Sequence, residues 1–235
     1  MTPYDLALAP LVAMQAIAVK ARAEVMPEAA GPRLGEIGQG AALRILILGD
    51  SSAAGVGVRT QAEALAGQLT ARLSRRHRVD WFLHAKSGAT TASTLRRLRL
   101  APKRPFDVSL VCLGINDAKN GVRGRAFQAR YARVLDRLRD DYAVERVYLA
   151  GMPPAELVPA LPNPLRDMLI ARLTWFDGLI RQIAAARPGA VHLPFDVTRD
   201  PSLMASDRFH PGPKLYAEWA GLAAAAIQRD RAALH

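Results

Sequence analysis

Several residues of this sequence have the types and positions that acyl transfer by a serine requires. Ser51 directly follows a run of apolar residues, and His210 lies three residues after Asp207. A serine hydroxyl becomes an effective nucleophile when a neutral imidazole takes its proton and a carboxylate orients that imidazole. The oxyanion that forms in the attack needs hydrogen-bond donors, and the backbone N–H of Gly88 and the side-chain amide of Asn116 are suitable ones. Each residue alone is a weak signal, and their coincidence predicts acyl-transfer chemistry.

The turn around Ser51 fits other glycine-containing motifs less well. A phosphate-binding P-loop needs Lys-Ser or Lys-Thr after its second glycine, and neither follows Gly55 or Gly57. The same two glycines begin a dinucleotide-binding pattern, but its third glycine is missing. The nucleophile elbow G-x-S-x-G fits except that Ala53 replaces the second glycine. From the turn alone, Ser51 is either a nucleophile or a serine that caps the next helix.

Short apolar runs alternate with helical patterns along most of the chain. Residues 45–48 are wholly apolar, which favours a strand buried on both faces of a parallel sheet. This alternation predicts a doubly wound parallel sheet with right-handed crossovers, whose strands end at a common ligand-binding edge. We expect the helix after Ser51 to point its N-terminal N–H groups at that edge. Further strands are predicted at residues 79–83, 106–113, 144–151 and 190–195, and helices at residues 61–75, 91–100, 125–142, 166–187 and 213–229.

The segments that carry these residues resemble the sequence blocks of the SGNH hydrolases, also called GDSL-type esterases and lipases. The resemblance spans residues 43–230 and implies a three-layer α/β/α flavodoxin-like fold with a five-stranded parallel sheet. It also implies that the protein uses no metal and no organic cofactor. The matching blocks, in order, are Gly49-Asp50-Ser51, Gly88, Gly114-Ile115-Asn116-Asp117 and Asp207-Arg208-Phe209-His210-Pro211.

The same resemblance implies a role for each candidate residue. Ser51 would be the nucleophile, His210 the base and Asp207 the carboxylate that orients it. The N–H groups of Ser51 and Gly88 and the amide of Asn116 would form the oxyanion hole. Two positions depart from the family pattern without removing a catalytic group: Ser52 stands where leucine is frequent, and Arg208 where glycine is frequent.

The expected reaction is hydrolysis of a small-molecule carboxylic ester through an acyl-enzyme. Residues 152–165 form an apolar loop with five prolines, and such a loop either lines a binding site or rigidly covers the sheet. The first interpretation favours small to medium acyl chains, with lysophospholipids among the candidates. Alternatives are a carbohydrate O-deacetylase, an acyl-CoA thioesterase of the same fold, and a ligand-binding module with an unused triad.

Other candidate residues have simpler explanations. His77, His84 and His192 lack the spacing of metal ligands, so we expect packed or surface histidines. Asp50 ends a strand as phospho-accepting aspartates do, but the second aspartate of that motif is absent. Cys112 is the only cysteine and lies in an apolar run, so it is expected in the core.

The chain carries a formal net charge of +11, mostly from arginines at helical spacing. We interpret them as solvated surface residues, and no nucleic-acid-binding motif accompanies them. Residues 1–42 are expected to form an apolar segment and a Gly/Pro-rich linker, residues 27–40, that pack on a hydrolase domain, residues 43–235. Residues 6–19 of this segment are too short to span a bilayer comfortably, and Pro10 interrupts them.

This apolar segment leaves two interpretations open. No positively charged region precedes residues 6–19, so we expect no signal peptide and a cytoplasmic protein. The segment then forms either a helix packed on the domain or an interfacial helix. In the second case Lys20 and Arg22, which follow it, would favour peripheral contact with an anionic membrane.

Overall fold

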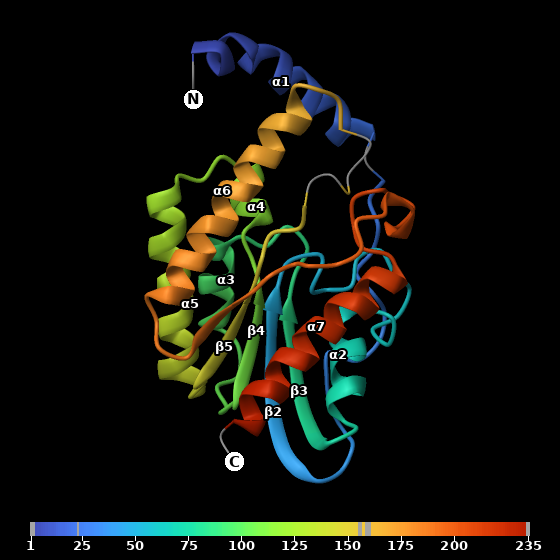
Figure 1. Cartoon of the computed structure of the whole chain (residues 1–235), viewed down its shortest axis with the longest axis vertical. Helices are drawn as coiled ribbons and strands as arrows, with labels where there is room; N and C mark the ends of the chain where they lie inside the picture. The colour runs from blue at the N-terminus through green and yellow to red at the C-terminus, as the bar shows by residue number, and fades with distance from the viewer. Residues whose placement is uncertain (1–2, 23, 155–156, 158–160, 234–235) are drawn as a thin grey trace.

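A six-stranded β-sheet forms the centre of the protein, in the order β1-β3-β2-β4-β5-β6 (Figure 1). The structure is a computed structural model that describes residues 3–22, 24–154, 157 and 161–233. Five of its strands run parallel, as expected, and share one carboxyl-terminal edge. They are β2 (Ala41–Gly49), β3 (His77–Ala85), β4 (Val108–Cys112), β5 (Arg146–Ala150) and β6 (Ala190–Leu193).

The sixth strand, β1 (Leu34–Ile37), corrects the expectation of five strands and of a plain linker over residues 27–40. It pairs antiparallel with β3 at the edge of the sheet, with Leu34 opposite Phe82. Most of its side chains are exposed, and its sequence, Leu-Gly-Glu-Ile, lacks the alternation of apolar and polar residues that would predict a strand. The strand is defined by its backbone pairing with β3, which is distant in the sequence and therefore gives no local signal.

Helices cover both faces of the sheet and give the expected three layers (Figure 1). Ile45 and Ile47 of β2 pack into the core on one face, whereas Leu46 and Leu48 pack into the core on the other. This alternation explains why that strand is apolar at every position. The first core includes residues of α2 (Leu65–Leu73) and α7 (Pro213–Ala232), and the second includes residues of α3 (Thr91–Leu98), α5 (Gly124–Tyr142) and α6 (Leu165–Ala185).

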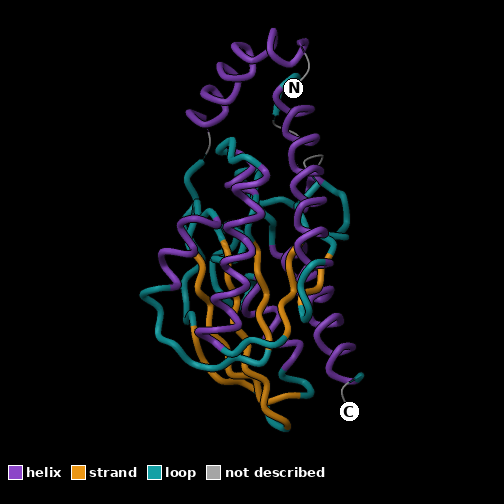
Figure 2. The backbone as a smooth tube through the Cα atoms, turned by 90° about the vertical axis from the view of Figure 1, so that its left-hand side faces the viewer, coloured by secondary structure: helices purple, strands orange, loops and turns teal. Residues whose placement is uncertain are grey.

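Further helices in the described part of the chain are α1 (Pro3–Arg22), the short α4 (Ile115–Lys119) and a 3₁₀ helix, η2 (Pro201–Leu203). Figures 1 and 2 place α1 beyond one end of the sheet, next to the start of α6. There the Gln15 amide donates to the Asn163 carbonyl at 2.7 Å and accepts from the Leu165 N–H at 3.1 Å. Among the described helices, none combines the length and the apolar character needed to cross a bilayer.

Candidate active site

Ser51, His210 and Asp207 form a continuous chain of hydrogen bonds. The Ser51 Oγ lies 2.8 Å from His210 Nε2, and His210 Nδ1 lies 2.5 Å from Asp207 Oδ2. The bond to a carboxylate places a proton on Nδ1, which leaves Nε2 free to accept the Ser51 proton. The three residues that the sequence singled out for nucleophilic catalysis therefore meet in the geometry that this chemistry needs.

Ser51 lies in a series of turns that follows β2. The Ala54 N–H donates to the Asp50 carbonyl and the Val56 N–H donates to the Ser51 carbonyl, so the chain coils tightly past the serine. Gly57, with φ of +106°, brings this coil against the segment that carries His210. A Cβ on Gly57 would lie 2.4 Å from the Pro211 carbonyl oxygen, so a larger residue would push the two segments apart.

This coil also corrects an expectation about the next helix. We expected helix from residue 61, with its N-terminus directed at Ser51, but α2 begins only at Leu65. Gln61 instead sits in a turn, where its buried side-chain amide donates to the carbonyls of Ala29 and Ala54. The dipole of α2 therefore supplies no argument for stabilising charge at Ser51.

The loop between η2 and α7 holds the imidazole and its carboxylate in place. Asp207 Oδ1 accepts the backbone N–H groups of Phe209 and His210 at 2.9 and 3.0 Å. Arg208, between them, has φ of +54°, a conformation that explains why glycine is suited to this position. Burial alone would raise the pKa of Asp207, but the hydrogen bonds from His210 and from the backbone outweigh it and lower that pKa.

The surroundings of His210 favour its neutral form. Burial is the main cause of a pKa below the usual value, and the nearby Lys119 ammonium lowers it further, against the opposing effect of Asp207. The Phe209 ring packs edge-on against the imidazole, with ring centroids 5.1 Å apart. The Lys119 ammonium lies 4.5 Å from the centroid of the same phenyl ring. His210 is thus available as a base at neutral pH.

The expected oxyanion donors converge near Ser51. Asn116, on α4, donates from its amide to Asp50 Oδ2 at 3.3 Å and to the Ala89 carbonyl at 3.1 Å. These acceptors are the neighbours in sequence of Ser51 and of Gly88, so one amide connects both segments. The backbone N–H groups of Ser51 and Gly88 donate to no other group in the described part of the chain, and both are available to an oxyanion.

Asp50 is a buried carboxyl whose contribution the sequence did not reveal. It accepts the Ser52 N–H at 3.1 Å as well as the Asn116 amide, and burial raises its pKa to about 7. Lys119, one helical turn after Asn116 on α4, opposes that rise. Asp50 stood next to Ser51 in the first sequence block, but its role as the acceptor for Asn116 depends on the fold.

An apolar pocket opens beside Ser51 and Asn116. The described part of the apolar loop contributes Met152, Pro153, Pro154 and Leu157, which agrees with the interpretation that this loop lines a site. Residues 155–156 and 158–160 of the loop lie outside the described residues. The remaining apolar lining includes Leu113, Ile115, Leu169, Leu173, Phe195, Met204, Phe209, Leu215 and Trp219.

The comparison with protein families identifies the chain. The model of the GDSL-like lipase/acylhydrolase family matches residues 47–218, which include all four catalytic sequence blocks. The protein belongs to this family. It is therefore a hydrolase, and the SGNH resemblance of its sequence is confirmed. A comparison with curated protein sequences found no match.

Several solved structures share the fold. TesA is 22% identical, with 77% of this chain and 95% of that chain covered and a TM-score of 0.61. The psychrotrophic esterase EstA from Pseudoalteromonas sp. is 20% identical, with coverages of 79% and 97% and a TM-score of 0.56. Axe2, an acetylxylan esterase from Geobacillus stearothermophilus, is 16% identical, with coverages of 82% and 94% and a TM-score of 0.56.

Three other residues that the sequence analysis considered in this GDSL hydrolase, His84, His192 and Cys112, are explained by burial or by pairing with another side chain. His192 Nε2 lies 3.0 Å from Asp177 Oδ1, and burial lowers the pKa of His84 to about 4. Cys112 is buried, which raises the pKa of its thiol and makes it unreactive. Within the described residues, no three His, Cys, Asp or Glu side chains group in a way that could hold a metal ion.

Proposed function

We propose that this GDSL hydrolase cleaves carboxylic esters through an acyl-enzyme formed on Ser51. The observation that carries the proposal is the hydrogen-bond chain from Ser51 Oγ through His210 to Asp207, at 2.8 and 2.5 Å. The same geometry, beside free backbone donors and an apolar pocket, also argues against a ligand-binding module that has lost turnover.

The proposed reaction has two halves. Ser51 Oγ attacks the ester carbonyl carbon while His210 Nε2 takes the hydroxyl proton, and the oxyanion accepts from the N–H groups of Ser51 and Gly88. It also accepts from the Asn116 amide, which gives up its 3.3 Å hydrogen bond to Asp50. The intermediate collapses, and His210 passes the proton to the departing alcohol. Water then attacks the acyl-enzyme with His210 again as base, which releases the acid and restores Ser51.

The apolar lining of the pocket supports an acyl chain of small to medium length as the part of the substrate that is bound. Leu157, Leu173 and Phe195 offer aliphatic and aromatic contacts with few hydrogen-bond partners. A sugar ring, whose hydroxyls need such partners, fits this lining less well, which disfavours the O-deacetylase alternative. Lysophospholipids and acyl-CoA thioesters are both included in the test below, since the proposed acyl-enzyme can form with either an alcohol or a thiol as the leaving group.

The first test is an activity panel of nitrophenyl esters of increasing chain length, lysophospholipids, acyl-CoA and acetylated sugars. We expect the highest kcat/KM for small or medium acyl esters. Highest activity on acetylated sugars would establish the deacetylase alternative. No turnover of any substrate, together with no labelling by a fluorophosphonate probe, would establish the binding-module alternative.

The second test asks which of two adjacent serines reacts. Ser51→Ala should abolish turnover and probe labelling, because only the Ser51 hydroxyl is paired with His210. Ser52→Ala should keep most activity, because Ser52 contributes its backbone N–H to Asp50, and alanine retains that group. Mass spectrometry of the labelled peptide locates the modification, and a label on Ser52 would overturn the assignment.

A further inference from the structure

We propose that α1 docks the mouth of the active-site pocket onto the surface of an anionic lipid membrane. The helix turns one side toward the domain, where Val12, Gln15 and Val19 are half-buried. The rest of its surface exposes three large apolar side chains at a spacing of three residues: Leu11 is 40% exposed, Met14 62% and Ile17 70%. No charged residue lies between positions 6 and 19. An apolar face of this kind gains free energy by entering the interfacial region of a bilayer.

Hydrogen bonds connect α1, and also the segment that follows it, to the rim of the pocket. Gln15 is hydrogen-bonded to Asn163 and Leu165, where the apolar loop that lines the pocket leads into α6. The Ser206 hydroxyl donates to the Glu24 carboxylate at 3.2 Å, and Ser206 belongs to the loop that carries Asp207 and His210. Figure 1 shows α1 beyond the carboxyl ends of the central strands. Ser51 lies at the same end of the sheet, because it follows β2 by two residues.

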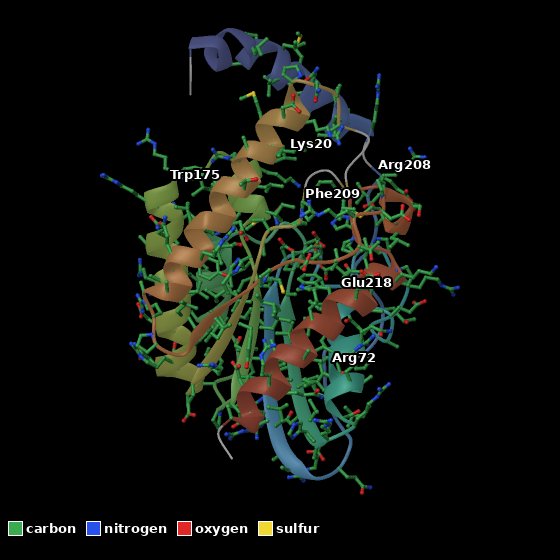
Figure 3. All side chains as sticks on the ribbon, in the orientation of Figure 1. Lys20, Arg72, Trp175, Arg208, Phe209 and Glu218 are labelled. Atoms are coloured by element: carbon green, nitrogen blue, oxygen red, sulfur yellow. The ribbon has the colours of Figure 1, made fainter. Side chains whose placement is uncertain are left out.

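The charges at this end complement an anionic surface. Lys20 and Arg22 follow the apolar face, and Arg208 lies on the catalytic loop; all three are exposed. Among the described residues, none of the three forms an ion pair with a carboxylate. Lys20 and Arg208 appear at the α1 end of the molecule in Figure 3. Cations placed beside an interfacial helix are attracted to anionic headgroups, and salt weakens that attraction.

A lipid surface suits this face better than a second copy of the chain. Two copies that met through α1 would bring together two molecules of net charge +11, whereas an anionic bilayer carries the opposite charge. Docking would hold the apolar pocket at the level of the lipid, so an acyl chain could enter without crossing water. This consequence for substrate entry rests on the proposed function, but membrane binding itself does not.

The test is flotation of the full chain with vesicles of phosphatidylcholine, with and without phosphatidylglycerol. The Ser51→Ala variant is measured in parallel, so that the binding result is independent of hydrolysis. We expect binding to the anionic vesicles, and about tenfold or greater weakening in the triple variant Leu11→Gln, Met14→Gln, Ile17→Gln. We expect a similar loss in Lys20→Glu, Arg22→Glu, and release of the wild type by about 0.5 M NaCl.

Matched variants separate docking from general effects of hydrophobicity and charge. The control for hydrophobicity changes three exposed apolar residues outside α1: Leu34→Gln, Ile37→Gln, Leu100→Gln. The control for charge reverses two positive charges just after α2, as the α1 variant does at its own site: Arg75→Glu, Arg76→Glu. Both should float with anionic vesicles nearly as well as the wild type. Apart from Ser51→Ala, all of these variants should keep their turnover of soluble short-chain esters, whereas the α1 variants should lose turnover of vesicle-embedded esters.

Three results would overturn the proposal. The first is no flotation of the full chain with anionic vesicles at low salt. The second is loss of binding in the Arg75→Glu, Arg76→Glu variant as large as that in Lys20→Glu, Arg22→Glu, which would indicate unspecific attraction. The third is a dimer in solution that the α1 triple variant converts to monomer, which would make a second copy the occupant. A catalytically inactive chain that still floats would leave this proposal standing and overturn the proposed function alone.

Discussion

At the scale of single residues, the polar groups around Ser51 are held in position by hydrogen bonds to one another. The Asn116 amide donates to Asp50, and Asp50 also accepts the N–H of Ser52, so the segment that carries the nucleophile is joined to α4. Lys119 on the same short helix is a cation near both Asp50 and His210. This arrangement favours the neutral imidazole and holds the Asn116 amide between Asp50 and the Ala89 carbonyl.

Asn116 is expected to act mainly in the transition state. Asn116→Ala should lower kcat by roughly a hundred- to a thousandfold, as is typical when one oxyanion donor is removed. KM should change little, because the donor gains strength only as the oxyanion forms. Steady-state kinetics on a soluble ester checks both parameters. An unchanged kcat would remove Asn116 from the mechanism.

His210 should give the pH profile of a base whose pKa is lowered. Since burial and Lys119 hold its pKa below 6.5, kcat/KM should rise with pH through a limb that lies on the acidic side of 6.5. Removing the positive charge in Lys119→Gln should move that limb to higher pH. A flat profile, with the chemical step rate-limiting, would contradict the assignment of His210 as the base.

In a separate variant, Asp207→Asn should reduce kcat severely and leave the fold intact, because the substitution removes control of the tautomer of His210.

At the scale of elements, one carboxylate on α6 connects three parts of the structure. Asp177 accepts the N–H of Met152, where the pocket loop begins, and it lies 3.0 Å from His192 Nε2 on β6. It also accepts from Arg181 one turn further along α6. Burial opposes ionisation, but these hydrogen bonds together lower the pKa of Asp177 to about 2.

This carboxylate should stabilise the folded state at neutral pH. A pKa that is lower in the folded than in the unfolded chain contributes stability above pH 4, and the contribution is lost as pH falls toward 2. Asp177→Ala should cost about 2 kcal/mol of unfolding free energy at pH 7, and the difference from wild type should vanish near pH 2. Denaturant unfolding at several pH values measures this, with Asp167→Ala, an exposed site on the same helix, as the control. Equal stability of both variants at pH 7 would contradict the role of Asp177.

At the scale of the whole molecule, the two cores explain which part of the chain the fold depends on. Among the residues whose burial the structure describes, neither core includes one before Ala29, and α1 contacts the domain mainly at the start of α6. Residues 28–37, in contrast, join the domain through the Glu28 carboxylate, which accepts the Ser87 N–H at 2.6 Å, and through the pairing of β1 with β3. The hydrophobic free energy of folding therefore comes almost entirely from the residues after α1.

Deletion of residues 1–25 should leave a folded enzyme. We expect the thermal midpoint to fall by no more than a few degrees, because no core residue is removed. Turnover of soluble esters should remain close to that of the full chain, since no residue of the triad is lost. Calorimetry and kinetics of the shortened chain provide the measurement. A large loss of stability would show instead that α1 packs on the domain as a structural helix.

The sequence by itself determined most elements of the fold, because their signals are local. The apolar run of β2 and the helical stripe of α6 follow from burial, so both were predictable, and the five parallel strands followed from their alternation with helices. The strand β1 and the short helix α4 were missed. An exposed edge strand and a helix of five residues have too few buried side chains to show a period.

The sequence also predicted the chemical groups of the candidate site, since recognisable blocks contain Ser51, Gly88, Asn116, Asp207 and His210. Only the tertiary structure decided how these groups meet. The hydrogen bond between Ser51 and His210 joins residues 159 positions apart, and no local pattern encodes it. The raised pKa of Asp50 and the lowered pKa of His210 likewise arise from burial and from charges across space, which exist only after the chain has folded.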